Sequence, residues 1–245
     1  MTSRKYRILE FGVVIIVGLF VYCINILSVA NNTTYRYAIE VWNYGRSFLN
    51  VLYPVIFTAP FCWLLFYEQN SFYWQYIYNR MMLKAYLRRR GITLIGLSSI
   101  AMFIVSVGGF VFAYIVEPIG RVLEYEPMMT YLFLGTFQID NPVVYVLVLS
   151  CWRGVLAGLY TFFSIMITLS TKNIFVAMTS AFVYSIMENF ILAVLQVPEL
   201  SICTSFYPNR LTGSAISYGK LAVGPIILLV ITLLTYFYNK WKYKR

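Results

Sequence analysis

Long apolar stretches constrain this chain more strongly than any other feature of its sequence. An α-helix rises about 1.5 Å per residue, so about 20 apolar residues cross the hydrocarbon core of a bilayer. Six stretches reach that length, and we expect a membrane-spanning helix from each: residues 8–29, 48–66, 92–116, 143–170, 174–197 and 221–238. The sequence therefore predicts an all-α integral membrane protein that forms one transmembrane domain over residues 1–245.

Composition supports this class and narrows the chemistry. Hydrophobic residues make up 60% of the chain and charged residues 11%, whereas soluble proteins carry about 25% charged residues. The chain has no histidine. Hydrolases with a histidine base, haem sites with an axial histidine and histidine-ligated zinc sites are therefore excluded. We expect a subunit without catalytic activity of its own.

The four cysteines, Cys23, Cys62, Cys151 and Cys203, form no CxxC pair. Cys23 and Cys62 lie in apolar stretches, where a thiol packs as a small hydrophobic group. Cys151 and Cys203 can both lie near the outer face, so a disulfide between these two remains open.

Basic residues are concentrated in one set of connecting segments, and this predicts the orientation. With six spans both termini lie on one side, and an excess of lysine and arginine marks the cytoplasmic side. The set that includes the termini holds Arg4, Lys5, Arg7, Arg80, Lys84, Arg88, Arg89, Arg90, Lys172, Lys240, Lys242, Lys244 and Arg245. We therefore expect cytoplasmic termini. The net charge of +10 reflects this topology and an attraction to anionic membrane lipid, and we expect no nucleic-acid partner.

Two segments on the opposite side are too apolar to be plain loops. Residues 127–137 and 202–218 mix aromatic residues with glycine, proline and asparagine. Such segments favour short helices that lie at the membrane interface or dip into it. We expect interfacial or re-entrant helices on the outer side.

The longest inner connection, residues 68–91, has strong helical propensity and no proline or glycine before Gly91. Two stripes recur at a spacing of four residues: Arg80, Lys84 and Arg88, and Tyr73, Ile77 and Met81. An interfacial helix anchored by its aromatic residues explains this pattern. A docking surface for a cytoplasmic partner explains it as well, because aromatic side chains beside basic ones are effective interface anchors.

The chain combines six spans with a characteristic order of residues between the second and third: Glu68 at the end of the second span, an aromatic-rich stretch, and then Arg80, Tyr86-Leu87 and basic residues before the third span. This pattern resembles the permease subunits of bacterial type 2 ABC (ATP-binding cassette) exporters, especially small Gram-positive ones that move peptides, lantibiotics or drugs. The resemblance covers nearly the whole chain in topology. The family often has a longer amphipathic helix before the first span, whereas only residues 1–7 precede it here.

The resemblance implies a subunit in a bacterial plasma membrane that pairs with an identical or similar permease and sits on a separate cytoplasmic ABC ATPase. No GxxxxGK[ST] loop occurs in the chain, so we expect no cofactor bound directly, with ATP and Mg on the partner. The family's coupling helix corresponds to residues 69–82, within a coupling segment of residues 69–90, and its outer re-entrant elements to residues 198–219. The expected coupling residues are Glu68, Tyr73, Trp74, Tyr76, Ile77, Arg80 and Lys84.

Charged and polar residues also occur inside the spans, where an unpaired charge is costly. Arg153 lies in the fourth span, and Glu188 and Asn189 lie in the fifth. Arg153 is about 15 Å and Glu188 about 13.5 Å from the outer end of its span, and a tight turn joins the two spans. We expect an ion pair between Arg153 and Glu188. The alternative is that these residues line the path of the substrate.

Small residues in the spans permit close helix packing. Gly154 and Gly158 form a GxxxG motif in the fourth span, and Gly109 and Ala113 form a similar pair in the third. We expect both to serve packing within the subunit.

The leading hypothesis is thus the transmembrane subunit of an ATP-driven exporter for a peptide-like or other amphipathic substrate. The alternative is a self-sufficient six-span secondary transporter or channel. Glu188 is the only carboxylate expected in the middle of a span, and this disfavours coupling to protons or ions. A third hypothesis, an enzyme with Glu188 as general acid or base, lacks an evident second catalytic group.

Overall fold

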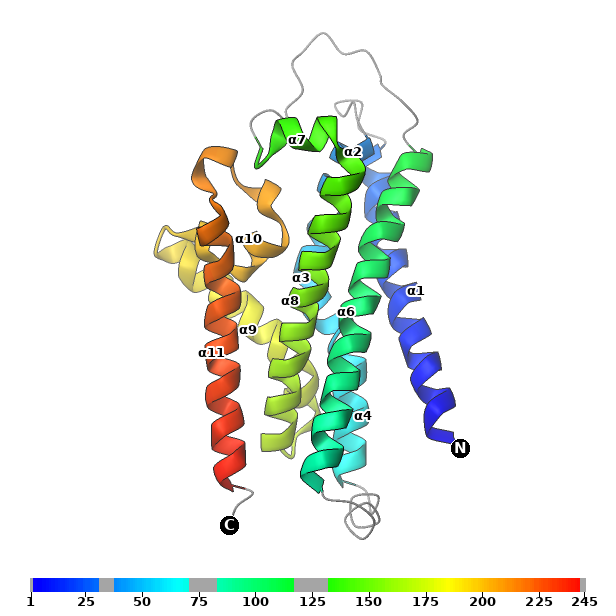
Figure 1. Ribbon diagram of the computed structural model, residues 1–245, viewed down its shortest axis with the longest axis vertical. Helices are drawn as coiled ribbons and strands as arrows, with labels where there is room; N and C mark the ends of the chain where they lie inside the picture. The colour runs from blue at the N-terminus through cyan, green and yellow to red at the C-terminus, as the bar shows by residue number, and fades with distance from the viewer. Residues whose placement is uncertain (1, 31–37, 71–82, 117–131, 243–245) are drawn as a thin grey trace.

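The computed structural model describes residues 2–30, 38–70, 83–116 and 132–242, and these residues are helical and without strands (Figure 1). Six long segments are apolar enough to cross a membrane: Phe11–Ala30, Phe48–Gln69, Ala85–Val116, Pro142–Ser170, Ile174–Val194 and Tyr218–Lys240. The predicted all-α membrane class and the six spans are confirmed. The protein is a multi-pass membrane protein in which the first helix begins and the last helix ends on the same side of the bundle (Figure 1).

The helices of the spans are α1 (Thr2–Ala30), α3 (Ser47–Ile56), α4 (Ala59–Asn70), α6 (Leu83–Val116), α8 (Pro142–Ser170), α9 (Ile174–Val194) and α11 (Tyr218–Lys242). Short helices occupy the connections on the side of the bundle away from the termini: α2 (Ala38–Tyr44), α7 (Gly135–Asp140), η2 (Pro198–Leu200), α10 (Ile202–Phe206), η3 (Pro208–Arg210) and η4 (Gly213–Ala215). The short helices expected within 202–218 are confirmed. Of the segment 127–137, residues 127–131 lie outside the described residues, and α7 begins within the remainder.

The second span is two helices instead of one, because two prolines interrupt its hydrogen-bond ladder. Pro54 lies inside α3, Pro60 follows the first residue of α4, and Phe57 and Thr58 separate the helices. The Phe57 carbonyl accepts a hydrogen bond from the Ser98 hydroxyl of α6 at 2.9 Å. A neighbouring helix thus satisfies a backbone group that the break leaves inside the bundle.

The third span begins earlier than expected. α6 continues without a break from Leu83 through Gly91 into the bilayer segment, whereas the sequence placed the boundary at Gly91. The basic residues Arg88, Arg89 and Arg90 therefore belong to the inner end of the span helix. Residues 71–82, which contain most of the predicted coupling helix, lie outside the described residues.

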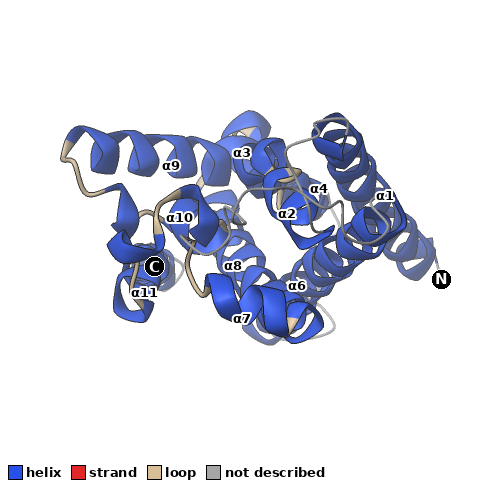
Figure 2. Cartoon of the chain, turned by 90° about the horizontal axis from the view of Figure 1, so that it is seen from above, coloured by secondary structure: helices blue, strands red, loops and turns tan. Residues whose placement is uncertain are grey.

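α8 lies at the centre of the bundle, where it packs most extensively against α6 and also against α4, α9 and α11 (Figure 2). Gly154 and Gly158 of α8 both face Ser99 of α6: a Cβ atom at Gly154 would lie 2.9 Å from the Ser99 carbonyl oxygen. The expectation that the GxxxG motif serves packing within the subunit is confirmed. Gly109 of α6 likewise faces the Tyr22 ring of α1.

Candidate functional site

The fifth span is joined to the outer connection through Glu188. Its Oε1 accepts a hydrogen bond from the Ile202 backbone N–H at 2.9 Å, and its Oε2 accepts one from the Ser201 hydroxyl at 2.8 Å. Ser201 is the N-cap of α10, and its hydroxyl also accepts from the Cys203 N–H. A carboxylate at a helix N-terminus is electrostatically favourable. Glu188 thus stabilises the start of the fully buried helix α10.

Arg153 of α8 binds the other end of the same short helix. Its Nε donates to the Phe206 carbonyl at 3.0 Å, and its Nη1 donates to the Ser106 hydroxyl at 3.0 Å. Trp152 adds a hydrogen bond from its indole N–H to the Ser205 carbonyl. A cation near a helix C-terminus is favourable for the same reason as an anion near the N-terminus.

The predicted ion pair between Arg153 and Glu188 is therefore wrong. Each side chain has other partners, and no salt bridge joins the two. Arg153 and Glu188 do lie at similar depths in their spans, but α10 lies between them and binds both. Backbone groups at the two ends of α10 compensate the two charges separately.

Asn189 is a third attachment point of the outer connection. Its Oδ1 accepts a hydrogen bond from Arg210 Nη1 at 2.7 Å. Nearby, Lys220 lies 3.4 Å from Glu199 Oε1. A hydrogen bond with its own backbone N–H and the contact with Lys220 lower the pKa of the Glu199 carboxyl. The connection between the fifth and sixth spans is thus attached to α9 and to the start of α11.

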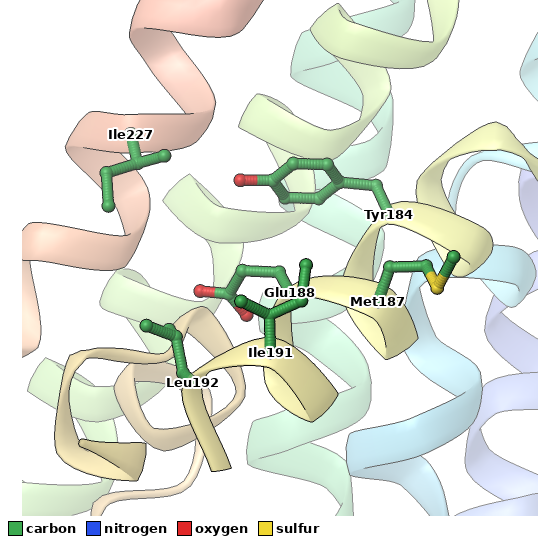
Figure 3. Close-up of a pocket in the computed structure, with 6 residues that line it drawn as sticks. All are labelled: Tyr184, Met187, Glu188, Ile191, Leu192 and Ile227. Atoms are coloured by element: carbon green, nitrogen blue, oxygen red, sulfur yellow. The ribbon is translucent and has the colours of Figure 1, made fainter. Parts of the chain in front are cut away.

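A groove between α9 and α11 lies beside Glu188. It encloses about 290 Å³ and is lined by Tyr184, Met187, Glu188, Ile191, Leu192 and Ile227. Figure 3 shows the Glu188 carboxylate and the Tyr184 hydroxyl directed from α9 toward α11. The Tyr184 hydroxyl has no hydrogen-bond partner. The surface that the groove exposes is apolar, because the Glu188 oxygens are bound to Ser201 and Ile202 and the Tyr184 oxygen is buried.

The end of the bundle that carries the termini holds a second candidate site, the Glu68 clamp (Figure 1). It is formed by Glu68 at the end of α4 and by Tyr86 and Arg90 of α6. Arg90 donates to both carboxylate oxygens of Glu68, at 2.6 and 3.2 Å, and the Tyr86 hydroxyl donates at 2.9 Å. A bidentate guanidinium–carboxylate contact fixes orientation as well as distance. The clamp joins the two helices that flank residues 71–82.

The structure brings together only part of the predicted coupling set. Glu68 lies in the clamp. Lys84 lies in α6, and its side chain is outside the description. The remaining members lie outside the described residues: Tyr73, Trp74, Tyr76, Ile77 and Arg80. Arg90 and Tyr86, which were expected only as basic and aromatic positions of the segment, are the partners of Glu68.

All four cysteines are free thiols. Cys151 is exposed on α8, whereas Cys203 is buried in α10, 3.4 Å from the Ser185 hydroxyl. Burial raises the pKa of the Cys203 thiol, which keeps it neutral and unreactive at neutral pH. The structure therefore does not form the disulfide that the sequence left open.

Within the described residues no group of three or more histidine, cysteine, aspartate or glutamate side chains is arranged to hold a metal ion. Comparison of the chain with family models, with curated proteins and with solved structures gives no match. The fold thus defines the class of the protein, a six-span membrane protein whose described residues are all-helical.

Proposed function

We propose that this protein is the transmembrane subunit of an ATP-driven ABC exporter in a bacterial plasma membrane. It forms the translocation path for a peptide, lantibiotic or other amphipathic substrate. A separate cytoplasmic ABC ATPase supplies the energy, and a second permease subunit, identical or similar, completes the transporter. Both termini face the cytoplasm in this arrangement, because the basic residues of the described helix ends lie on the side of the termini.

The Glu68 clamp is the observation that supports this proposal most strongly. A partner that pushes on the segment between α4 and α6 moves the spans only if the ends of the segment are held rigidly to those helices. Arg90 and Glu68 are 7% and 16% exposed, so their contact is shielded from water and strong. The clamp therefore makes the second and third spans respond together to force on residues 71–82.

The outer connection supports the proposal in a different way. The resemblance implies re-entrant elements between the fifth and sixth spans, and α10 is a buried short helix in that position. It contacts α8, α9 and α11. A tilt of these spans would therefore change its position, as expected for an element that closes a path on the outer side.

The test is co-purification and reconstitution with the ABC ATPase that the proposal requires. ATP hydrolysis should appear only when the two subunits are purified together, and Trp74→Ala or Tyr76→Ala should weaken their assembly. Glu68→Gln should preserve assembly and lower transport per ATP hydrolysed several-fold. Arg89→Gln is the matched control, since Arg89 is exposed on α6 next to the clamp. Robust hydrolysis by the isolated chain would refute the proposal.

The broken second span favours a second candidate, a self-sufficient secondary transporter or channel, because discontinuous helices are typical of secondary transporters. However, the Phe57 carbonyl at the break is already hydrogen-bonded to Ser98 and is not directed at a ligand site. Substrate movement by the reconstituted chain alone, driven by an ion gradient without ATP, would establish this candidate.

A further inference from the structure

Two arginines share one indole ring in the outer part of the bundle. The guanidinium carbon of Arg46, which lies between α2 and α3, is 3.7 Å from the centroid of the Trp42 ring. The guanidinium carbon of Arg153, on α8, is 4.8 Å from the same centroid. Their side chains are 0% and 1% exposed. Two positive charges are thus buried beside one another, on elements that are far apart in the sequence.

The hydrogen bonds of the two guanidiniums go to neutral acceptors only. Arg46 donates to the Trp42 carbonyl at 3.2 Å and to Asn43 Oδ1 at 2.7 Å. Arg153 donates to the Phe206 carbonyl and the Ser106 hydroxyl. Arg46 Nη1 and Arg153 Nη2 are both buried without a hydrogen-bond partner. Each arginine therefore has one terminal nitrogen with free donor capacity, and a guanidinium cannot accept.

A third unpartnered polar group lies in the same place. The Tyr145 hydroxyl of α8 is buried without a hydrogen-bond partner. The Tyr145 ring packs edge-on against Trp42 with centroids 6.4 Å apart, and Tyr145 interacts electrostatically with Arg46. We name Trp42, Arg46, Tyr145 and Arg153 the Trp42 cluster. Its three unpartnered groups can all donate, so its free hydrogen-bonding capacity is suited to an acceptor.

No acidic residue of the described chain forms an ion pair with either arginine. Glu40 of α2, the nearest acidic residue in the sequence to Arg46, is engaged in another interaction. Cation–π contact with Trp42 offsets only part of the cost of burying a guanidinium. The remaining cost is large for a charge inside a membrane protein. A bound anion would remove it.

We infer that the Trp42 cluster binds a compact oxyanion, the carboxylate or phosphate group of a solute or of a lipid headgroup. Arg46 Nη1, Arg153 Nη2 and the Tyr145 hydroxyl donate hydrogen bonds to its oxygens, and the two guanidiniums supply the charge. This inference does not depend on the partnership with an ATPase, because the binding groups all belong to this chain.

A network of three amides is linked to the cluster through Asn43, whose Oδ1 accepts a hydrogen bond from Arg46. Asn43 Nδ2 donates to Gln138 Oε1 at 2.8 Å, and Gln138 and Asn209 exchange hydrogen bonds at 3.2 Å. These three amides join α2, α7 and η3, of which α2 and α7 lie at the end opposite the chain termini (Figure 1). Neutral amide contacts separate at smaller cost than ion pairs.

Thermal unfolding of the purified full chain in neutral detergent tests the site. Sodium phosphate or sodium acetate should raise the midpoint of unfolding, whereas sodium chloride at the same ionic strength should not. Tyr145→Phe removes one donor and keeps the ring, so the variant should fold and its anion affinity should fall about tenfold. Tyr184→Phe is the matched control, because it removes another buried hydroxyl without a partner but leaves the cluster intact.

A second set of measurements distinguishes the source of the oxyanion. If a lipid headgroup is the ligand, phosphatidylglycerol nanodiscs without added phosphate should stabilise the chain more than phosphatidylcholine nanodiscs. Tyr145→Phe should then remove the difference. Stabilisation by phosphate or acetate alone identifies a soluble anion. An equal response to chloride, phosphate and both lipids would overturn the proposal, and so would a Tyr145→Phe response identical to that of the unaltered chain.

Discussion

At the scale of single residues, the charges inside the spans are compensated by backbone and hydroxyl groups. Glu188 accepts from an N–H and a hydroxyl at the start of α10, and Arg153 donates to a carbonyl at its end. Each interaction satisfies a backbone group at a helix terminus that has no partner within the helix. Glu188 and Arg153 thus hold α10 in the bundle, and because α10 lies between them they do not contact each other.

This arrangement predicts the outcome of a double-mutant cycle. Glu188→Gln should cost about 1–3 kcal/mol, because the amide replaces a charged acceptor of two donors. Arg153→Gln should also destabilise the fold. The double variant Glu188→Gln, Arg153→Gln should be less stable than either single variant, because the costs at the two ends of α10 add. Detergent-based unfolding curves measure this. Recovery of stability in the double variant would indicate the direct ion pair that the structure lacks.

Sequence reasoning found these two positions but not their partners, for a physical reason. Burial and depth follow from the length and hydropathy of a span, so a charge inside one is visible in the sequence. The position of a five-residue helix such as α10 depends on tertiary contacts with α3, α8, α9 and α11, which belong to four spans, and local propensity does not encode them. The sequence did not reveal the Trp42 cluster, because Arg46 precedes the predicted span 48–66 and a charge outside a span is not unusual. Its spacing of four residues from Trp42 is the one local signal of stacking.

At the scale of elements, close packing of α8 on α6 organises the bundle. Gly154 and Gly158 remove side chains where the two helices approach, so the α6 backbone lies directly against α8. The long apolar stretches predicted both helices. The break in the second span could have been predicted from Pro54 and Pro60, since each removes a backbone donor. The extension of α6 through Gly91 could not, because one glycine ends a helix only where packing allows it.

The helix contact predicts opposite effects for two glycine substitutions. Gly154→Ala would place a Cβ 2.9 Å from the Ser99 carbonyl oxygen, and a backbone atom cannot rotate away. We expect a loss of about 1–3 kcal/mol in the free energy of unfolding. Gly96→Ala on α6 is the control, because no atom lies within 4 Å of its Cβ position, and it should be neutral or stabilise by up to about 1 kcal/mol. Unfolding in detergent compares the two, and equal effects would contradict the packing argument.

At the scale of the whole molecule, the bundle has two chemically different ends. The end with the termini carries exposed basic residues, among them Arg88, Arg89, Lys172 and Lys240. The other end carries short helices joined by amide and hydroxyl contacts. Charge distribution along the sequence was enough to predict this polarity, because the positive-inside rule depends on which loops hold lysine and arginine and not on the details of packing.

This polarity predicts the result of site-directed labelling in intact cells. Ser214 lies in η4, just before α11, and Lys172 lies in the turn between α8 and α9; both are exposed. In a cysteine-free background, Ser214→Cys should react with a membrane-impermeant maleimide added outside the cells. Lys172→Cys should react only after permeabilisation, because the basic end should face the cytoplasm. Reversed labelling would invert the orientation. Reaction of both from outside would mean that α9, the one predicted span between these two positions, does not cross the membrane.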